Sequence, residues 1–135
     1  MVIATVWKTV GIGSIPILDS MKYLIIVLFI TSIAKSITGT ASYYSNKFHG
    51  RKTANGDIYN KYKYTAASNK FNLGDSVKVI NLRNRKEITV LINDRMTNNS
   101  RLIDLSYAAA DSLDFIKEGT TKVIVDRTAS YSDRE

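Results

Sequence analysis

The stretch Ile88-Thr89-Val90-Leu91-Ile92-Asn93-Asp94-Arg95 is the most informative part of this 135-residue chain. It begins with five apolar or β-branched residues, a composition typical of a strand, and it ends on three polar side chains. Similar short runs lie on both sides of it and are predicted to be strands as well. These runs are Gly39–Tyr44, Tyr62–Ala67, Val77–Ile80, Leu102–Leu105 and Thr121–Val125.

One helix interrupts the predicted strands. It covers Tyr107–Leu113, and Ser106 stands where an N-cap is expected. Six short strands and one helix leave many strand edges exposed, and closure into a small barrel removes those edges. The pattern therefore predicts a mainly β domain that is a small closed barrel, followed by a frayed polar tail from Asp126.

The N-terminal part has a different pattern. After Met21 and Lys22 comes the apolar run Leu24–Ile30, and then Ala34 and Ser36 at the spacing of a cleavage site. The run is shorter than the roughly 20 apolar residues that span a bilayer. We interpret this segment as a secretory signal peptide. An uncleaved anchor and a buried core helix are the alternatives.

The chain is accordingly divided into four parts. Residues 1–20 are interpreted as a mis-assigned upstream extension, residues 21–36 as the signal peptide, residues 37–128 as the barrel domain and residues 129–135 as a flexible tail. Residues 1–36 hold three of the nineteen Lys and Arg and one of the twelve Asp and Glu, so the net charge falls from +7 to +5 on cleavage. A basic, exported domain favours an anionic cell-wall or membrane surface over nucleic acid. We expect a monomer in the periplasm or cell envelope that meets envelope or cell-division proteins.

Cysteine is absent and His49 is the single histidine, which excludes several kinds of chemistry. Without cysteine the chain has no disulfide, no thiol nucleophile and no lipidated cysteine, so it is not expected to be a lipoprotein. One histidine cannot build a multi-histidine metal site, and no metal or organic cofactor is expected. His49 is interpreted as a residue that holds its loop together. Carboxylate chemistry, such as the cleavage of a glycosidic bond, remains.

Asp94 is the best single candidate for that chemistry, because the end of an apolar strand presents a side chain rigidly. Asn93 beside it is expected to hydrogen-bond sugar hydroxyls. The alternative is that Asp94 pairs with Arg95 or Arg101, or caps the loop that follows. Asp57 is either a second carboxylate or a residue of an Asn-Gly-Asp turn.

Two further groups have structural and functional interpretations. Asp104 precedes the predicted helix and is expected to be a partner of the helix N-terminus. Five tyrosines are numerous enough to stack on sugar rings, although strand-spaced aromatic residues also pack in cores and on barrel surfaces. These tyrosines are Tyr43, Tyr44, Tyr59, Tyr62 and Tyr64.

Blocks spread over residues 38–126 together resemble the rare lipoprotein A (RlpA) family, in the family's order and spacing. The blocks are Gly39–Tyr44, Phe48–Gly56, Tyr64–Ala67, Leu73–Val79, Asn81-Leu82, Asn93–Arg95, Arg101–Ser106 and Ala108–Ala110. The resemblance implies a six-stranded double-psi β-barrel, as in the related expansins. It also implies a lytic transglycosylase that acts on peptidoglycan strands stripped of their stem peptides.

The resemblance implies a role for particular residues. Asp94 falls on the family's essential acid/base aspartate, Asp57 stands where the family usually has Glu, and Ser68 stands where it usually has His. Asp94 would protonate the oxygen between N-acetylmuramic acid and N-acetylglucosamine, then take a proton from the C6 hydroxyl as a 1,6-anhydro ring closes. Substrate-binding roles are expected for Asp57, Asn93, Ser68 and Tyr44.

Two other interpretations stay open, and the change from His to Ser at position 68 favours the first of them. One is a non-catalytic, expansin-like module that binds the cell wall. The other is hydrolysis by an inverting pair of carboxylates, Asp57 and Asp94.

Overall fold

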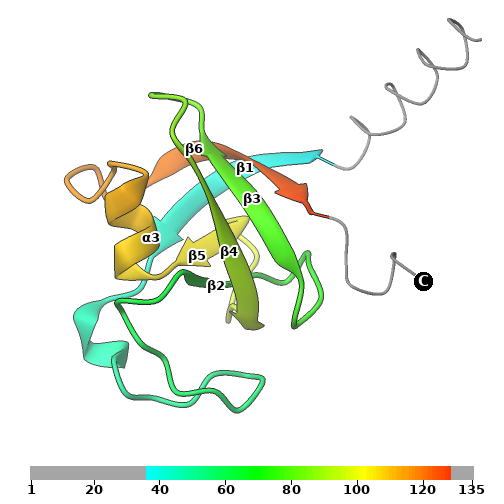
Figure 1. Ribbon diagram of the computed structural model, residues 1–135, viewed down its shortest axis with the longest axis vertical. Coiled ribbons are helices and arrows are strands. Elements are labelled where there is room, and N and C mark those ends of the chain that lie inside the picture. The colour runs from blue at the N-terminus through cyan, green and yellow to red at the C-terminus, as the bar shows by residue number, and fades with distance from the viewer. Residues whose placement is uncertain (1–35, 129–135) are drawn as a thin grey trace, which may run out of the picture. The chain divides into compact units, whose positions relative to one another are not determined.

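The computed structural model describes residues 36–128, and these residues form a single closed β-barrel (Figure 1). Around the barrel the six strands follow the order β1-β5-β2-β4-β3-β6. The elements are β1 (Ser36–Tyr43), the short 3-10 helix η2 (Asn46–Phe48), β2 (Thr65–Ala67), β3 (Ser76–Asn81), β4 (Glu87–Asp94), β5 (Ile103–Leu105), α3 (Tyr107–Ser112) and β6 (Thr121–Arg127). The predicted closed barrel of six strands and one helix is therefore confirmed.

The barrel mixes parallel and antiparallel pairing. β1 pairs in parallel with β5, and β2 pairs in parallel with β4, while the other four neighbouring pairs are antiparallel. Parallel neighbours need a crossover, so the connections between such strands are long. The longest connection runs from β1 to β2 and extends from one end of the barrel, whereas the turn between β3 and β4 lies at the opposite end (Figure 1).

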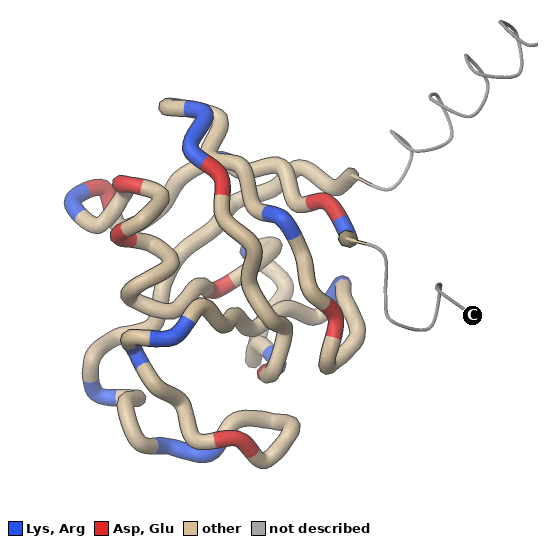
Figure 2. Tube along the Cα trace, in the orientation of Figure 1, with Lys and Arg blue, Asp and Glu red and all other residues tan. Residues whose placement is uncertain are grey.

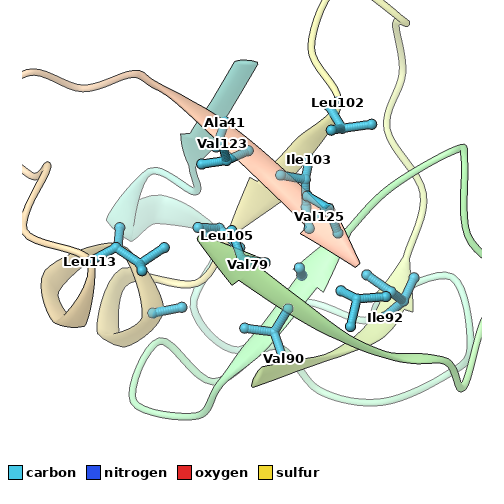
Figure 3. Packing of buried hydrophobic residues seen from close by; sticks show 14 of the residues in the cluster. Ala41, Val79, Val90, Ile92, Leu102, Ile103, Leu105, Leu113, Val123 and Val125 are labelled. Carbon is cyan, nitrogen blue, oxygen red and sulfur yellow. The ribbon is translucent and has the colours of Figure 1, made fainter. Parts of the chain in front are cut away.

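The core fills the inside of the barrel with small and medium apolar side chains. Along β3 the side chains of Val77, Val79 and Asn81 are buried and alternate with more exposed ones, as expected for a strand with one face inward. Leu113 and Phe115, which follow α3, are also fully buried in this cluster (Figure 3). The barrel thus has one continuous core that fixes the ends of the strands.

Several strand boundaries differ from the predicted ones, and β1 already begins at Ser36, ahead of the predicted Gly39. The predicted strand Tyr62–Ala67 begins only at Thr65, because Tyr62 and Tyr64 are largely exposed and belong to the preceding connection. The expectation of a frayed tail from Asp126 was wrong, because this residue pairs with β1 and β3 inside β6. Pairing on both sides makes the end of β6 part of the barrel.

The predicted helix is confirmed with its cap. The Ser106 hydroxyl accepts a hydrogen bond from the Ala109 N–H at 3.3 Å, and the helix ends at Ser112. No helix within residues 36–128 has the length and apolar character to span a membrane. The predicted signal peptide, apart from Ser36 at the start of β1, lies outside the described residues. The same holds for residues 1–20 and for the tail 129–135.

Candidate functional site

Asp94 lies at the end of β4, where the pairing with β2 shifts by one residue. Ala66 is opposite Ile92, whereas Ala67 is opposite Asp94, so Asn93 is an extra residue in β4. Strict alternation from the buried Ile92 would return Asp94 to the core side of the sheet. The bulge instead places Asp94 beside Ala67, on the outer face of the barrel, where it is half-buried.

The Asp94 carboxylate accepts three hydrogen bonds from donors within residues 36–128. Its Oδ2 accepts the Tyr44 hydroxyl at 2.6 Å. Its Oδ1 accepts the N–H groups of Ala54 and Arg95, each at 2.8 Å. Two backbone donors hold one oxygen in place, and in the described part of the chain the other oxygen accepts a hydrogen bond only from the Tyr44 hydroxyl. The carboxylate therefore has a fixed orientation and one oxygen with free capacity.

The alternative that Asp94 serves an ion pair does not hold within residues 36–128. The Arg95 guanidinium donates to two carbonyls of the 68–71 turn, and Arg101 pairs with Asp104. The predicted loop cap is present in part, because the carboxylate accepts the N–H of Arg95 at the start of the following loop.

Tyr44 is held as a neutral hydrogen-bond donor. Its ring packs against Tyr59, with centroids 4.5 Å apart, and against Phe48 at 5.8 Å. Burial raises the pKa of the Tyr44 hydroxyl well above its ordinary value, and the hydrogen bond to Asp94 raises this pKa further. The hydroxyl therefore keeps its proton and donates to Asp94.

Asp57 lies in the predicted turn. The Asn55 amide accepts the Asp57 N–H at 3.0 Å and donates to the Asp57 carboxylate at 2.9 Å. The turn interpretation is confirmed, and the same turn adjoins the site, since Asn93 donates to Asp57 at 3.5 Å and Ala54 belongs to the turn. Asn93 itself is almost fully buried.

Comparison with known proteins decides the family. Residues 36–125 match the family model described as lytic transglycolase. The chain belongs to this family. It is 41% identical over 95 residues to "Endolytic peptidoglycan transglycosylase RlpA" of Campylobacter jejuni, covering 70% of this chain and 34% of that protein. The protein of the same name from Pseudomonas aeruginosa is 47% identical over 94 residues, covering 69% of this chain and 28% of that protein.

The chain thus spans about a third of the length of these curated relatives. Solved structures share the fold at lower identity. Streptomyces papain inhibitor matches with a TM-score of 0.58 and 24% identity, covering 70% of this chain and 94% of that one. An expansin of Clavibacter michiganensis matches with a TM-score of 0.56 and 18% identity, covering 70% and 50%. The barrel is the double-psi β-barrel that the sequence resemblance implied.

Ser68, at the position where the sequence resemblance implied a histidine, is in contact with the backbone of Asp94. It is fully buried, and its hydroxyl donates to the Leu102 carbonyl at 2.8 Å and accepts the Lys70 N–H at 3.2 Å. Its own N–H donates to the Asp94 carbonyl at 3.2 Å. The hydroxyl is thus occupied within the protein, and Ser68 supports the backbone of Asp94.

Asp104 was expected at the helix N-terminus, and this expectation was wrong. Asp104 lies on β5, where it accepts the Ser42 hydroxyl and pairs with Arg101 at 3.1 Å, while Ser106 caps the helix. The strand register aligns Asp104 with Ala67, the same residue that lies opposite Asp94. The two aspartates therefore lie in one row, with Cα atoms about 10 Å apart. Sequence spacing carries no signal for this neighbourhood, because it depends on the strand order.

His49 holds its loop together, as predicted. Its Nδ1 accepts the Lys61 N–H at 3.2 Å, and its ring lies 6.0 Å from that of Tyr62. Of the five tyrosines, Tyr59 is buried, whereas Tyr62 and Tyr64 are 70% and 49% exposed. Within residues 36–128, no three His, Asp or Glu side chains come together as metal ligands would.

Proposed function

We propose that this chain is a lytic transglycosylase that cleaves the glycan strands of peptidoglycan, with Asp94 as its catalytic residue. The observation that carries this proposal is the bulge in β4. It turns one carboxylate out of the core, and among residues 36–128 the Tyr44 hydroxyl is the only donor to one of its oxygens. The family and the names of the relatives indicate the substrate.

Asp94 acts first as an acid and then as a base. Backbone N–H groups hold Oδ1, so Oδ2 is the oxygen that carries the proton. This proton passes to the glycosidic oxygen between N-acetylmuramic acid and N-acetylglucosamine, and the bond from that oxygen to muramoyl C1 breaks. The carboxylate then removes the proton of the C6 hydroxyl as O6 bonds to C1. A 1,6-anhydro ring forms and no water is consumed.

Tyr44 and Ser68 are positioning residues in this scheme. The neutral Tyr44 hydroxyl donates to Oδ2 whenever Asp94 is ionised, which stabilises the basic form between the two proton transfers. Ser68 holds the backbone at Asp94, because its N–H donates to the Asp94 carbonyl. The exposed carboxylate of Asp57 is the group next to Asp94 that contacts sugar hydroxyls, and the buried Asn93 amide holds it in place by donating to it at 3.5 Å.

A non-catalytic, expansin-like module that binds the cell wall is the second candidate. The buried serine at position 68 favours it, because this position carries no imidazole that could assist proton transfer. Either function belongs in the cell envelope. We propose that residues 21–36 direct export and that the domain acts as a monomer. Removal of the signal peptide after Ser36 would shorten β1 by its first residue.

The experiment uses the full chain on glycan strands that lack stem peptides. Wild type is expected to release 1,6-anhydro-muramoyl ends, and Asp94→Asn is expected to abolish their release while keeping the fold. Asp111→Asn, an exposed aspartate on α3, is the matched control and should match wild type. If Asp94→Asn releases anhydro ends at the wild-type rate, the assignment is wrong. If neither wild type nor the two variants release anhydro ends but all three bind sacculi, the chain is a non-catalytic binding module.

A further inference from the structure

The connection between β1 and β2, residues 45–64, carries an unbalanced positive charge. We call this segment the basic loop. It holds five cationic side chains and one carboxylate, Asp57 (Figure 2). The cations are Lys47, Arg51, Lys52, Lys61 and Lys63.

Elsewhere in the described barrel part of the positive charge is compensated by ion pairs, whereas that of the basic loop is not. Within residues 36–128, five other Lys and Arg side chains form ion pairs, and none of these pairs involves the basic loop. The pairs are Lys78–Glu87, Arg83–Glu118, Lys86–Asp114, Arg101–Asp104 and Arg127–Asp75. The positive charge of the basic loop is therefore uncompensated by the described part of the protein, and it favours an anionic ligand.

Aromatic rings hold three of these cations at the surface. Lys47 Nζ lies 5.3 Å from the centre of the Phe48 ring, and the Arg51 guanidinium lies 5.4 Å from the same centre. Lys61 Nζ lies 5.1 Å from the Tyr62 ring. Cation–π contact orders these side chains but leaves their charge in place.

The backbone of the basic loop is also fixed. The Gly50 N–H donates to Tyr59 at 2.9 Å, and the Tyr59 N–H donates to Arg51 at 2.7 Å. The carbonyl of Lys61 accepts the N–H of Ala108 in α3 at 2.9 Å. An ordered array of charges loses little conformational entropy when it binds a ligand.

The tip of the basic loop lies on the candidate catalytic residue. The Ala54 N–H donates to the Asp94 carboxylate, and the Asn55 N–H donates to the Asn93 carbonyl at 3.2 Å. Arg51 and Lys52 directly precede this tip. A glycan strand with its scissile bond at Asp94 therefore has Arg51 and Lys52 beside it, and the other cations of the basic loop lie further along the same segment.

We propose that the basic loop binds the free lactyl carboxylates of the muramic acid residues next to the scissile bond. Each N-acetylmuramic acid carries a lactyl group whose carboxyl is joined to the stem peptide by an amide bond. Removal of the peptide leaves one carboxylate on every second sugar, so a stripped strand is a regular polyanion. Identifying the glycan as the ligand rests on the proposed function, whereas the charge of the loop does not. The basic loop thus selects strands without stem peptides.

Binding tests this proposal separately from turnover. The full chain carrying Asp94→Asn is titrated at low ionic strength with stripped glycan strands and with the same strands after their lactyl carboxylates are converted to amides. Two double variants of the basic loop, Arg51→Gln/Lys52→Gln and Lys61→Gln/Lys63→Gln, are compared with Lys86→Gln/Lys117→Gln. This control removes the same charge outside the basic loop and lies in exposed segments.

The proposal predicts that amidation weakens binding about tenfold. Each loop variant should weaken binding of the carboxylate strands by roughly five- to tenfold, and of the amidated strands by less than about twofold. The control should bind both strands like the parent. Equal loss on both strands, or no effect of amidation, would overturn the proposal. So would loop-dependent binding to phosphatidylglycerol vesicles with no preference between the strands. A preference without anhydro products would leave the inference standing and remove only the enzymatic function.

Discussion

At the scale of single residues, one extra residue in β4 decides whether the Asp94 side chain points into the core or into the candidate site. The same strand places Val90 and Ile92 in the core, and the bulge at Asn93 is what releases Asp94 from that alternation. The side chain then gains the Tyr44 hydroxyl, which comes from a position 50 residues away in the sequence. Chemistry at this site depends on the contact between these two residues.

Replacing Tyr44 with Phe should lower the rate of anhydro-end formation by roughly tenfold or more, because Asp94 loses a hydrogen bond to its charged form. Tyr43→Phe is the matched control. Its hydroxyl donates to the Ile116 carbonyl at 2.9 Å, away from the carboxylate. A rate for Tyr44→Phe equal to that of the control would show that the hydroxyl does not assist Asp94.

The raised pKa of Tyr44 gives a dependence of stability on pH. Below pH about 10 the hydroxyl is neutral in both the folded and the unfolded chain. Above it, only the unfolded chain ionises at this position, so wild type loses stability relative to Tyr44→Phe. Urea unfolding of both proteins at pH 8 and pH 11 measures their free energies of unfolding. If the stability of wild type relative to Tyr44→Phe is the same at both pH values or rises at pH 11, the prediction is wrong.

Ser68→Ala should lower the free energy of unfolding by about 1–2 kcal/mol, because the buried Leu102 carbonyl loses its hydroxyl donor. Ser76→Ala, at an exposed position of β3, should change it by less than about 0.5 kcal/mol. Urea unfolding checks both. If the two variants are equally stable, Ser68 does not support the site.

Sequence alone identified the main candidate residues but not all of their neighbours. Asp94 and Asp57 were found because an apolar run and an Asn-Gly-Asp turn mark them locally. Asp104 was expected to be a partner of the helix N-terminus, because its hydrogen bond from Ser42, 62 residues away, depends on the pairing of β1 with β5. Contacts of that range have no signature in local spacing.

At the scale of elements, the close packing of β1 against the start of β5 fixes the row that contains the site. A Cβ atom at Gly39 would lie 2.6 Å from the Leu102 Cβ, and the Leu102 N–H is bonded to the Thr40 carbonyl at 2.8 Å. The two segments have no room to separate without losing this bond.

Gly39→Ala should therefore reduce the free energy of unfolding by about 1–3 kcal/mol. Thr38→Ala, one residue earlier on an exposed part of β1, is the control and should cost less. Thermal or urea unfolding checks the difference. A Gly39→Ala protein as stable as the control would mean that β1 and β5 are less tightly packed.

Strands were predictable where every second side chain is apolar and buried. They were less predictable where aromatic side chains alternate in sequence but are exposed. β3, β4 and β6 came from runs of β-branched residues whose alternate members are buried. Tyr62 and Tyr64 alternate in the same way, yet they are exposed in the basic loop and do not pair in β2. Alternation shows that a segment is extended, while pairing depends on a neighbouring strand.

At the scale of the whole molecule, the sequence predicts that the sheet closes into a barrel. It predicts the sign of the net charge but not where the charge lies. The need to cover strand edges predicted a barrel, and the resemblance supplied the double-psi topology. Net charge predicted an anionic partner but not its location. The fold gathers five of the cations in the connection between β1 and β2 and anchors the tip of this connection on Asp94.

The most direct test of the account is the chemistry of the new chain ends. The full wild-type chain is incubated with stripped glycan strands in water labelled with oxygen-18, and the products are analysed by mass spectrometry. The account predicts ends that are lighter than hydrolysis products by one water and carry no label, because O6 of the same sugar attacks C1. Reducing ends that carry the label would contradict it and would indicate hydrolysis by the Asp57 and Asp94 pair.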